Sequence, residues 1–289
     1  MHYKKYKSIL SAQNGMNLYR GCTHGCVYCD SRSLCYRMEH DFEDIEIKQD
    51  AAEMLEAELG RKRKKCMVGT GSMCDPYMPV ERELNLTRRC LEIIYKYGFG
   101  LTIQTKSTLI LRDIDLLAAI HERTKCVVQI TLTTFDEGLC KILEPNVSTT
   151  RERFDALTAF RERGIPTVVW MTPILPFIND TEENIRGLMD YCVRAGVRGL
   201  LHFGLGVTLR DGDREYFYAA LDRHFPGVKQ KYIARYGGAY SCKPDNGDRL
   251  MNIVYEAADR HGIMVDEDEV FAYMHSMEKD GGPQQMTFI

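Results

Sequence analysis

Cys22-Thr-His-Gly-Cys-Val-Tyr-Cys29 brings three cysteines together at the spacing C-x3-C-x2-C, directly after a strand-like run at residues 16–20. Three thiolates this close together hold a metal well. A [4Fe–4S] cluster normally takes four thiolates, so three leave one iron without a protein ligand and open to a small molecule. A zinc knuckle is the alternative, in which a fourth ligand such as His24, Cys35 or His40 completes the set.

The composition is that of an ordinary globular chain. Its 289 residues are 44% hydrophobic, which is enough for one large or two small domains. No stretch approaches the roughly 18–20 apolar residues of a membrane span, and the N-terminus lacks the apolar region of a signal peptide. Eleven cysteines without a disulfide-like pattern indicate reduced thiols, so we expect a cytoplasmic protein. A net charge of −3 weighs against a dedicated nucleic-acid module.

Hydrophobic patterning predicts a regular alternation of strands and helices. We expect strands over 16–20, 66–71, 101–105, 126–132, 167–171 and 199–203. The helices between them are expected over 50–59, 86–97, 113–123, 150–163 and 181–195. This order indicates an α/β fold of parallel strands with right-handed crossovers. A doubly wound open sheet is one architecture that fits it.

The pattern changes after about residue 210, where four further helices are expected over 214–225, 229–235, 248–261 and 268–277. We therefore expect an N-terminal arm over 1–14, a core over 15–210, a helical extension over 211–278 and a flexible tail over 279–289.

Polar side chains follow several of the expected strands, at the edge of the sheet where parallel α/β proteins bind ligands. Lys106 follows the third strand and is placed to pair with a carboxylate, although a solvated loop lysine has the same signature. Trp170 lies near the end of the fifth strand and is expected in the core rather than at a substrate. The remaining candidates lie at the carboxyl ends of the second and fourth strands or just after them: Ser72, Cys74, Asp75, Tyr77, Thr131 and Thr133.

The cysteine loop, with the aromatic Tyr28 before its last cysteine, resembles the signature of the radical S-adenosylmethionine (radical SAM) superfamily. The resemblance implies that Cys22, Cys26 and Cys29 hold a [4Fe–4S] cluster whose fourth iron is chelated by the methionine moiety of S-adenosylmethionine. One electron, from a donor such as flavodoxin or ferredoxin, then cleaves the sulfonium, and a 5′-deoxyadenosyl radical abstracts hydrogen. The implied fold is a partial (β/α)6 TIM-like barrel of parallel strands, with the helical extension closing its open side.

Within that superfamily, residues 15–205 are similar to the spore photoproduct lyase-like family. The pieces that carry the likeness are Cys74-Asp-Pro-Tyr-x-Pro-x-Glu81, Thr105-Lys-Ser107, Arg112-Asp113, Glu144-Pro145, Arg153, Gly164-Ile-Pro166 and Pro173-x-x-Pro176. The likeness implies that S-adenosylmethionine is bound by Tyr28, by the loop with Ser72, Cys74 and Asp75, and by Lys106. Thr131 and Thr133 are expected to add hydroxyls.

The substrate is less determined by the sequence. The lyase has a hydrogen-donating cysteine at the position of Ser72, which puts thymine-dimer repair in doubt. Cys74 is the candidate to replace that donor, with Tyr77 as a second catalytic candidate. The tail Gln285-Met-Thr-Phe-Ile289 looks like the peptide that docks bacterial DNA-maintenance proteins on the sliding clamp.

We therefore expect an enzyme that acts on DNA, in repair or modification. The alternatives are a radical SAM enzyme that modifies a peptide, an RNA or a small metabolite, and a non-enzymatic zinc or iron–sulfur binding module.

Overall fold

The centre of the protein is a sheet of six strands in the order β2-β5-β6-β7-β8-β9, seen here in a computed structural model that describes residues 1–279. Every neighbouring pair in it is parallel. The strands are β2 (Gly15–Met16), β5 (Met67–Thr70), β6 (Gly100–Thr105), β7 (Cys126–Thr131), β8 (Thr167–Trp170) and β9 (Gly199–Leu201). Along this sheet the six strands follow one another in the order in which they occur in the chain. A doubly wound sheet would reverse its strand order at one point, so the doubly wound alternative is wrong. The sheet is the partial TIM-like barrel of the radical SAM resemblance.

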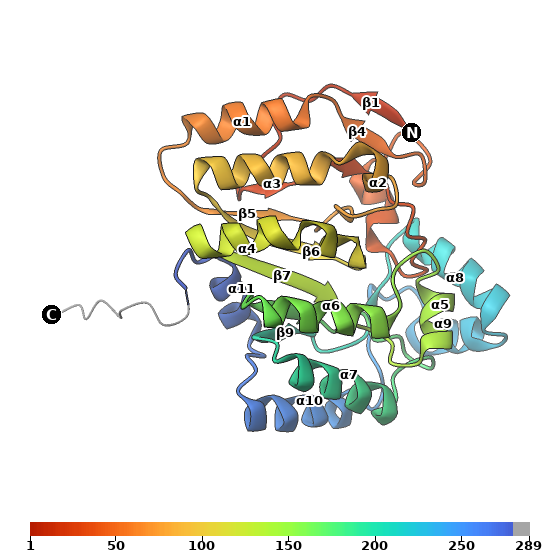
Figure 1. Cartoon of the computed structure of the whole chain (residues 1–289). Helices are drawn as coiled ribbons and strands as arrows, with labels where there is room; N and C mark the ends of the chain where they lie inside the picture. Colours follow the sequence, from red (N-terminus) through yellow and green to blue (C-terminus); the bar gives the residue numbers. More distant parts are fainter. Residues whose placement is uncertain (280–289) are drawn as a thin grey trace, which may run out of the picture.

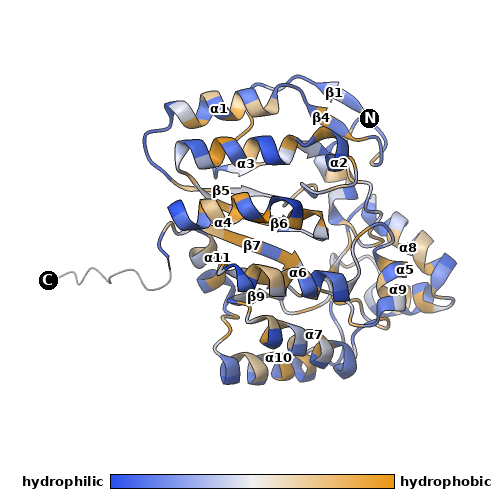
Figure 2. Cartoon of the chain, viewed as in Figure 1, coloured by the Kyte–Doolittle hydropathy of each residue, from blue (hydrophilic) through white to orange (hydrophobic). Residues whose placement is uncertain are grey.

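The five helices expected between these strands are present and cover one side of the sheet (Figure 1). Each shows a polar and an apolar face (Figure 2). Their ends follow local signals: α3 and α7 stop at Gly98 and Gly196, both with positive φ, and Thr149 caps α6. The helices are α1 (Ala51–Arg61), α3 (Leu86–Tyr97), α4 (Ile114–Arg123), α6 (Thr150–Glu162) and α7 (Glu182–Ala195).

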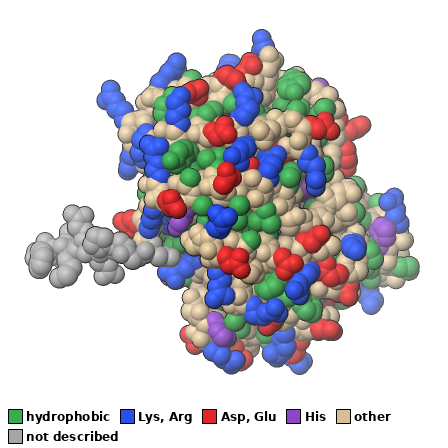
Figure 3. Space-filling model, in the orientation of Figure 1, with side chains coloured by type: hydrophobic (Ala, Val, Ile, Leu, Met, Phe, Trp, Pro, Cys, Tyr) green, Lys and Arg blue, Asp and Glu red, His purple; other side chains and the backbone are tan. Residues whose placement is uncertain are grey.

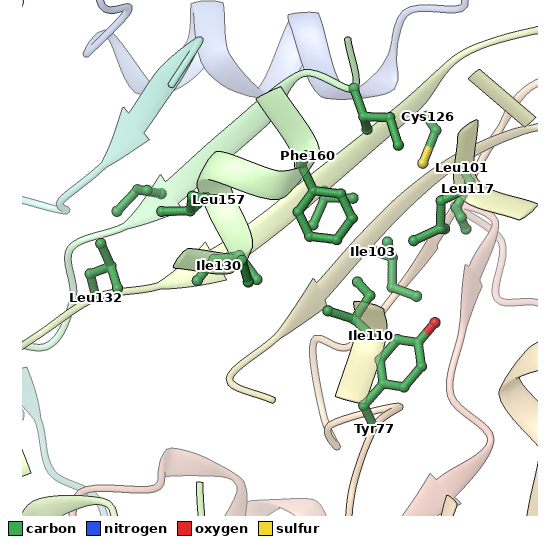
Figure 4. Packing of buried hydrophobic residues seen from close by; sticks show 14 of the residues in the cluster. Tyr77, Leu101, Ile103, Ile110, Leu117, Cys126, Ile130, Leu132, Leu157 and Phe160 are labelled. Atoms are coloured by element: carbon green, nitrogen blue, oxygen red, sulfur yellow. The ribbon is translucent and has the colours of Figure 1, made fainter. Parts of the chain in front are cut away.

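The main core lies between these helices and the sheet. Figure 4 shows Leu157 and Phe160 of α6 packed near Ile130 of β7 and Ile103 of β6. All four side chains are at most 1% exposed. Burying such a side chain contributes about 1.5–3 kcal/mol, so this layer is the main source of stability of the scaffold.

The N-terminal segment differs from the expected loosely packed arm. Strand β1 (His2–Lys4) joins β4 (Glu46–Lys48) and β3 (Tyr19–Arg20) in a separate three-stranded sheet of order β1-β4-β3. The backbone N–H groups of Ile9 and Leu10 donate to the carboxylate of Glu58. Strands of two or three residues carry too little alternation to be recognised in the sequence.

The run at residues 16–20, expected as one strand, is also divided. Its first residue belongs to β2 in the main sheet and its last two form β3 in the N-terminal sheet. The cysteine loop therefore starts from the N-terminal sheet, with only Gly21 between β3 and Cys22.

The four C-terminal helices are present as α8 (Asp213–His224), α9 (Val228–Tyr236), α10 (Gly247–His261) and α11 (Glu267–His275). Helix α10 packs on α7 and α11 packs on β9. The N–H of Leu200 donates to the carbonyl of Met264 at 2.8 Å, so this segment also covers the edge of the sheet. The clamp-docking peptide predicted at Gln285–Ile289 lies outside the described residues.

Several short elements complete the chain. Helices α8 and α9 form a second core with Cys26, Val27 and Tyr28 of the cysteine loop. Beside that core, β10 (Val207–Thr208) pairs antiparallel with β11 (Ser241–Cys242). The others are η1 (Asp30–Arg32), η2 (Leu34–Tyr36), η3 (Thr108–Asp113), α2 (Glu81–Leu84) and α5 (Glu137–Leu143).

The surface carries both charges intermixed, as the nearly balanced composition requires; Figure 3 shows this for one face. Within residues 1–279, the helices are too short or too polar to cross a membrane.

Candidate functional site

The three cysteines of the C-x3-C-x2-C motif face one hollow of about 120 Å³ at the carboxyl edge of the sheet. Cys22 and Cys26 are buried, Cys29 is half-buried, and all three are free thiols. Burial raises the pKa of Cys22 to about 12 and raises the pKa of Cys26 and Cys29 as well. Without a metal these sulfurs are therefore neutral thiols, and binding a metal would release their protons.

Backbone hydrogen bonds hold the cysteine loop at both ends. The N–H of Cys22 donates to the carbonyl of Phe42 at 3.0 Å, and the N–H of Val27 donates to the carbonyl of Leu143 at 3.0 Å. Gly21 has φ 85°, and a Cβ there would collide with the Phe42 carbonyl, so only glycine fits this turn. The loop is thus positioned by the protein before any metal binds.

This donor set fits a cluster with one iron left for a ligand. Of the three fourth ligands considered for a zinc knuckle, Cys35 is exposed beside Arg210, and His40 faces Glu46. Only His24 lines the hollow, and its Nδ1 lies 3.4 Å from the carboxylate of Asp75. None of these three candidates is free to act as a fourth protein ligand. The site therefore offers three thiols, which is the arrangement that the motif predicts for a cluster with one open iron.

Asp75 joins three segments around the hollow. Its carboxylate accepts hydrogen bonds from the Thr105 hydroxyl at 2.6 Å, the Lys106 N–H at 2.7 Å and the Tyr77 N–H at 2.8 Å. With the contact to His24 Nδ1, this side chain connects the cysteine loop, the loop after β5 and the end of β6. The sequence reading gave Asp75 a cofactor role; the contacts show in addition that it fixes the walls of the site.

Lys106 extends along the same wall. Its ammonium lies 3.3 Å from the Thr131 hydroxyl and 6.0 Å from the centre of the Tyr28 ring. Lys106, Tyr28 and Ser72 line a larger cavity that adjoins the cysteines, and Thr131 lines the smaller hollow. The structure brings these predicted cofactor residues together, and their role in binding stays a prediction.

Three predicted residues have other surroundings. Tyr77 is fully buried in the main core, where its hydroxyl donates to Asp113 at 3.0 Å (Figure 4). Thr133 is also fully buried. Cys74 lines the smaller hollow, but its thiol donates to the Tyr19 carbonyl at 3.0 Å, and burial raises its pKa to about 12.

The larger cavity, of about 360 Å³, has an aromatic wall that the sequence reading missed. Trp170 packs against a buried cluster, as expected, and also lines this cavity beside Phe203, with ring centres 5.6 Å apart. Phe203 is 42% exposed and has φ 50°, a conformation that is unusual for a bulky residue and is typical of functional sites. Strand β9 ends at Leu201, earlier than expected, which leaves Phe203 in the loop.

A buried network of one hydrogen bond and one ion pair holds Tyr28 of the cysteine loop in place. The Tyr28 hydroxyl donates to Glu144, and Glu144 forms an ion pair with Arg153, with both charged side chains fully buried. Burial alone would raise the pKa of Glu144, but the charge of Arg153 lowers it overall, so the carboxylate is ionised. Arg153 also donates to the Thr131 carbonyl at 2.7 Å, which links the loop to the end of β7.

Comparison with known proteins agrees with this geometry. A model of the radical SAM superfamily matches residues 16–192. An uncharacterized protein of Mycobacterium tuberculosis (strain H37Rv) is 31% identical over 227 residues, which are 76% of this chain and 66% of that protein. The chain thus spans about two thirds of the length of this relative.

Two solved structures share the fold. A spore photoproduct lyase mutant with bound AdoMet and dinucleoside spore photoproduct aligns with TM-score 0.62, at 14% identity, over 86% of this chain and 74% of its own. Streptococcus suis SuiB bound to S-adenosylmethionine aligns with TM-score 0.52, at 13% identity, over 92% and 49%. Members of this superfamily use a [4Fe–4S] cluster and S-adenosylmethionine. With the matched segment covering the cysteine motif and the strands around it, the chain belongs to the radical SAM superfamily.

Proposed function

We propose that the protein is a radical SAM enzyme that acts on DNA, with a base of the substrate held against Trp170 and Phe203. The observation that carries this proposal is the larger cavity, which has two cysteines of the motif on one wall and the aromatic pair on another. When bound, the cluster and S-adenosylmethionine supply a 5′-deoxyadenosyl radical after reduction by a donor such as flavodoxin or ferredoxin. The residues of this chain bind and orient the reactants.

The cofactor end of the cavity has the charges needed for an amino acid moiety. The Lys106 ammonium, next to the Thr131 hydroxyl, is placed to pair with a carboxylate. Tyr28 offers a ring whose hydroxyl is already held by Glu144, which fixes the position of the far end of the ring. Ser72 lies where the two hollows meet, since it lines both of them.

The substrate end has features that suit a nucleobase. An indole and a phenyl ring side by side offer a stacking surface, and every base has a π-face that can stack on it. The Thr208 and Ser241 side chains on the same cavity add hydroxyls for hydrogen bonds. The dinucleoside bound in the spore photoproduct lyase structure supports this substrate class.

Thymine-dimer reversal through a cysteine donor has weaker support. Ser72 occupies the position of the hydrogen-donating cysteine, and Cys74 directs its thiol to the Tyr19 carbonyl. We therefore favour DNA modification, or a repair reaction that does not use a thiol donor.

The test uses anaerobically reconstituted protein with S-adenosylmethionine and a chemical reductant. Release of 5′-deoxyadenosine is measured without substrate and with plain DNA, UV-irradiated DNA, RNA or short peptides. We expect DNA oligonucleotides to increase the release and to be modified. Stimulation by peptides alone would contradict DNA as the substrate, and one zinc per chain with no deoxyadenosine formed would contradict the enzyme itself.

The aromatic wall gives a second prediction. Replacing Trp170 by alanine should weaken DNA binding by about 5–150-fold, because loss of base stacking costs roughly 1–3 kcal/mol. Trp170→Phe keeps a ring and should recover most of the affinity. Fluorescence anisotropy of labelled oligonucleotides measures both, with Tyr95→Ala, an exposed ring on α3, as the control. Equal affinity for Trp170→Ala and the unchanged protein would rule out stacking on this wall.

A further inference from the structure

A second group of metal-binding side chains lies at the N-terminal sheet. His2 on β1, together with His40 and Asp44 from the segment before β4, offers one ligand atom per residue, all within 4.8 Å of one another. Glu46 on β4 is the register partner of His2 in the parallel β1–β4 pair, so its backbone lies directly beside that of His2. The two hollows of the candidate active site are lined by other residues.

Hydrogen bonds set the orientation of both imidazoles. His2 Nδ1 lies 2.9 Å from an Asp44 carboxylate oxygen, and His40 Nδ1 lies 3.0 Å from the Asp41 carbonyl oxygen. Because these oxygens only accept, Nδ1 carries the hydrogen in both rings, and a neutral imidazole then has its lone pair on Nε2. Metal-binding histidines are held in this way, through the ring nitrogen that does not bind the metal.

Both Nε2 atoms face the same carboxylate oxygen. Glu46 Oε2 lies 3.7 Å from His2 Nε2 and 3.6 Å from His40 Nε2. The Glu46 side chain is 1% exposed, and neither its Oε2 nor His40 Nε2 has a hydrogen-bond partner among the described residues. Acceptors that face one another in a buried place are unfavourable unless a cation lies between them.

The charge of Glu46 agrees with a cation site. The Tyr6 hydroxyl donates to Glu46 Oε1, so Oε2 is the oxygen left to face the two imidazoles. Lys4 lies 3.3 Å from Oε2 and is the resident cation. Its side chain is 43% exposed and is therefore free to turn into solvent when another cation binds.

We propose that His2, His40 and Glu46 bind one divalent transition-metal ion of the zinc type, with Asp44 holding the His2 ring through Nδ1. Imidazole and carboxylate donors suit such ions. Donors at 2.0–2.2 Å from a tetrahedral zinc are roughly 3.3–3.5 Å from one another, so separations of 3.6–3.7 Å need only small movements. His2 precedes residues 16–192, so this ligand set is not contained in the segment that matches the superfamily.

The ion would stabilise the segment that holds the start of the cysteine loop. The segment with His40 and Asp44 also carries Phe42, whose carbonyl accepts the Cys22 N–H and lies against Gly21. A metal that ties this segment to β1 and β4 restrains the start of the cysteine loop. Its role is structural, and it is separate from the cluster.

The test measures zinc in protein that already holds its iron. Anaerobically reconstituted protein is treated with a mild chelator, equilibrated with zinc, and analysed for both metals by mass spectrometry and for zinc ligands by X-ray absorption. We expect about one zinc per chain beyond the iron, with only nitrogen and oxygen neighbours. His40→Ala should lower the zinc affinity at least about tenfold. His261→Ala, at the exposed end of α10, should leave the affinity unchanged.

A variant that is expected to bind zinc more tightly is needed as well, because His40→Ala could lose zinc affinity simply by misfolding. Lys4→Met removes the competing ammonium and should raise the zinc affinity, which a misfolded protein would not do. Sulfur neighbours around the zinc would overturn the proposal, because they would place the ion at the cysteines. No zinc uptake, or equal zinc affinity of His40→Ala and the unchanged protein, would overturn it as well. None of these outcomes depends on the DNA assay.

Discussion

Replacing Cys26 by alanine is expected to abolish cluster binding and the formation of 5′-deoxyadenosine. Cys26 is 7% exposed and lines both hollows, and no other described cysteine apart from Cys74 shares the smaller hollow with the three of the motif. Cys74 is held by the Tyr19 carbonyl, so two thiols remain where the cluster needs three. Iron should fall from about four per chain to well below one, with loss of the cluster absorption.

Cys35→Ala is the matched control for this experiment. Cys35 is a free, exposed cysteine beside Arg210, and it lines neither hollow. Its replacement should keep the iron content, the absorption spectrum and the deoxyadenosine yield. Full iron in Cys26→Ala, or loss of iron in Cys35→Ala, would show that the cluster is held by a different set of cysteines.

Breaking the buried pair of Glu144 and Arg153 is expected to have the second largest effect. Replacing either partner leaves an uncompensated charge in the core, which costs about 3–5 kcal/mol of the free energy of unfolding. Glu144→Met also removes the acceptor of the Tyr28 hydroxyl, so the cysteine loop should bind its cluster less tightly. Denaturant unfolding of the metal-free protein measures the stability, and iron content after dilution measures the second effect.

The double variant Glu144→Met, Arg153→Met tests the physical cause. Because it leaves no unpaired buried charge, it should be less destabilised than either single variant. The exposed pair of Arg235 and Asp245 is the control, with side chains 55% and 59% exposed and an expected cost of about 0.2–1 kcal/mol. Additive losses in the double variant would mean that the charges are not coupled.

The sequence predicted the repeated units well. Strands of four to six residues, such as β6 and β7, and the long helices have enough residues for their hydrophobic period to be recognised. Segments of two or three residues that stand outside a longer apolar run do not, which is why β1, β4, β10 and β11 were missed. Strand β9 was placed too long because Phe203 continues the apolar run of Leu200 and Leu201.

For the site, the sequence showed which residues follow the strands but not which way they point. Lys106 and Asp75 are near the cysteines as expected, whereas Tyr77, two residues after Asp75, turns into the core. The contact between Tyr28 and Glu144 joins residues 116 positions apart, and no local pattern predicts such a pair. Trp170, the last residue of β8, packs on a core cluster as predicted, but the sequence did not show that it also lines the larger cavity.

The cysteine loop has one more consequence. Cys22 belongs to the main core beneath the barrel helices, whereas Cys26 belongs to the separate core with α8 and α9. The eight residues of the cysteine loop thus connect two hydrophobic cores. A cluster bound by the loop would determine how firmly these two cores are held together. The segment that carries the three cysteines is therefore also the segment that connects the two cores.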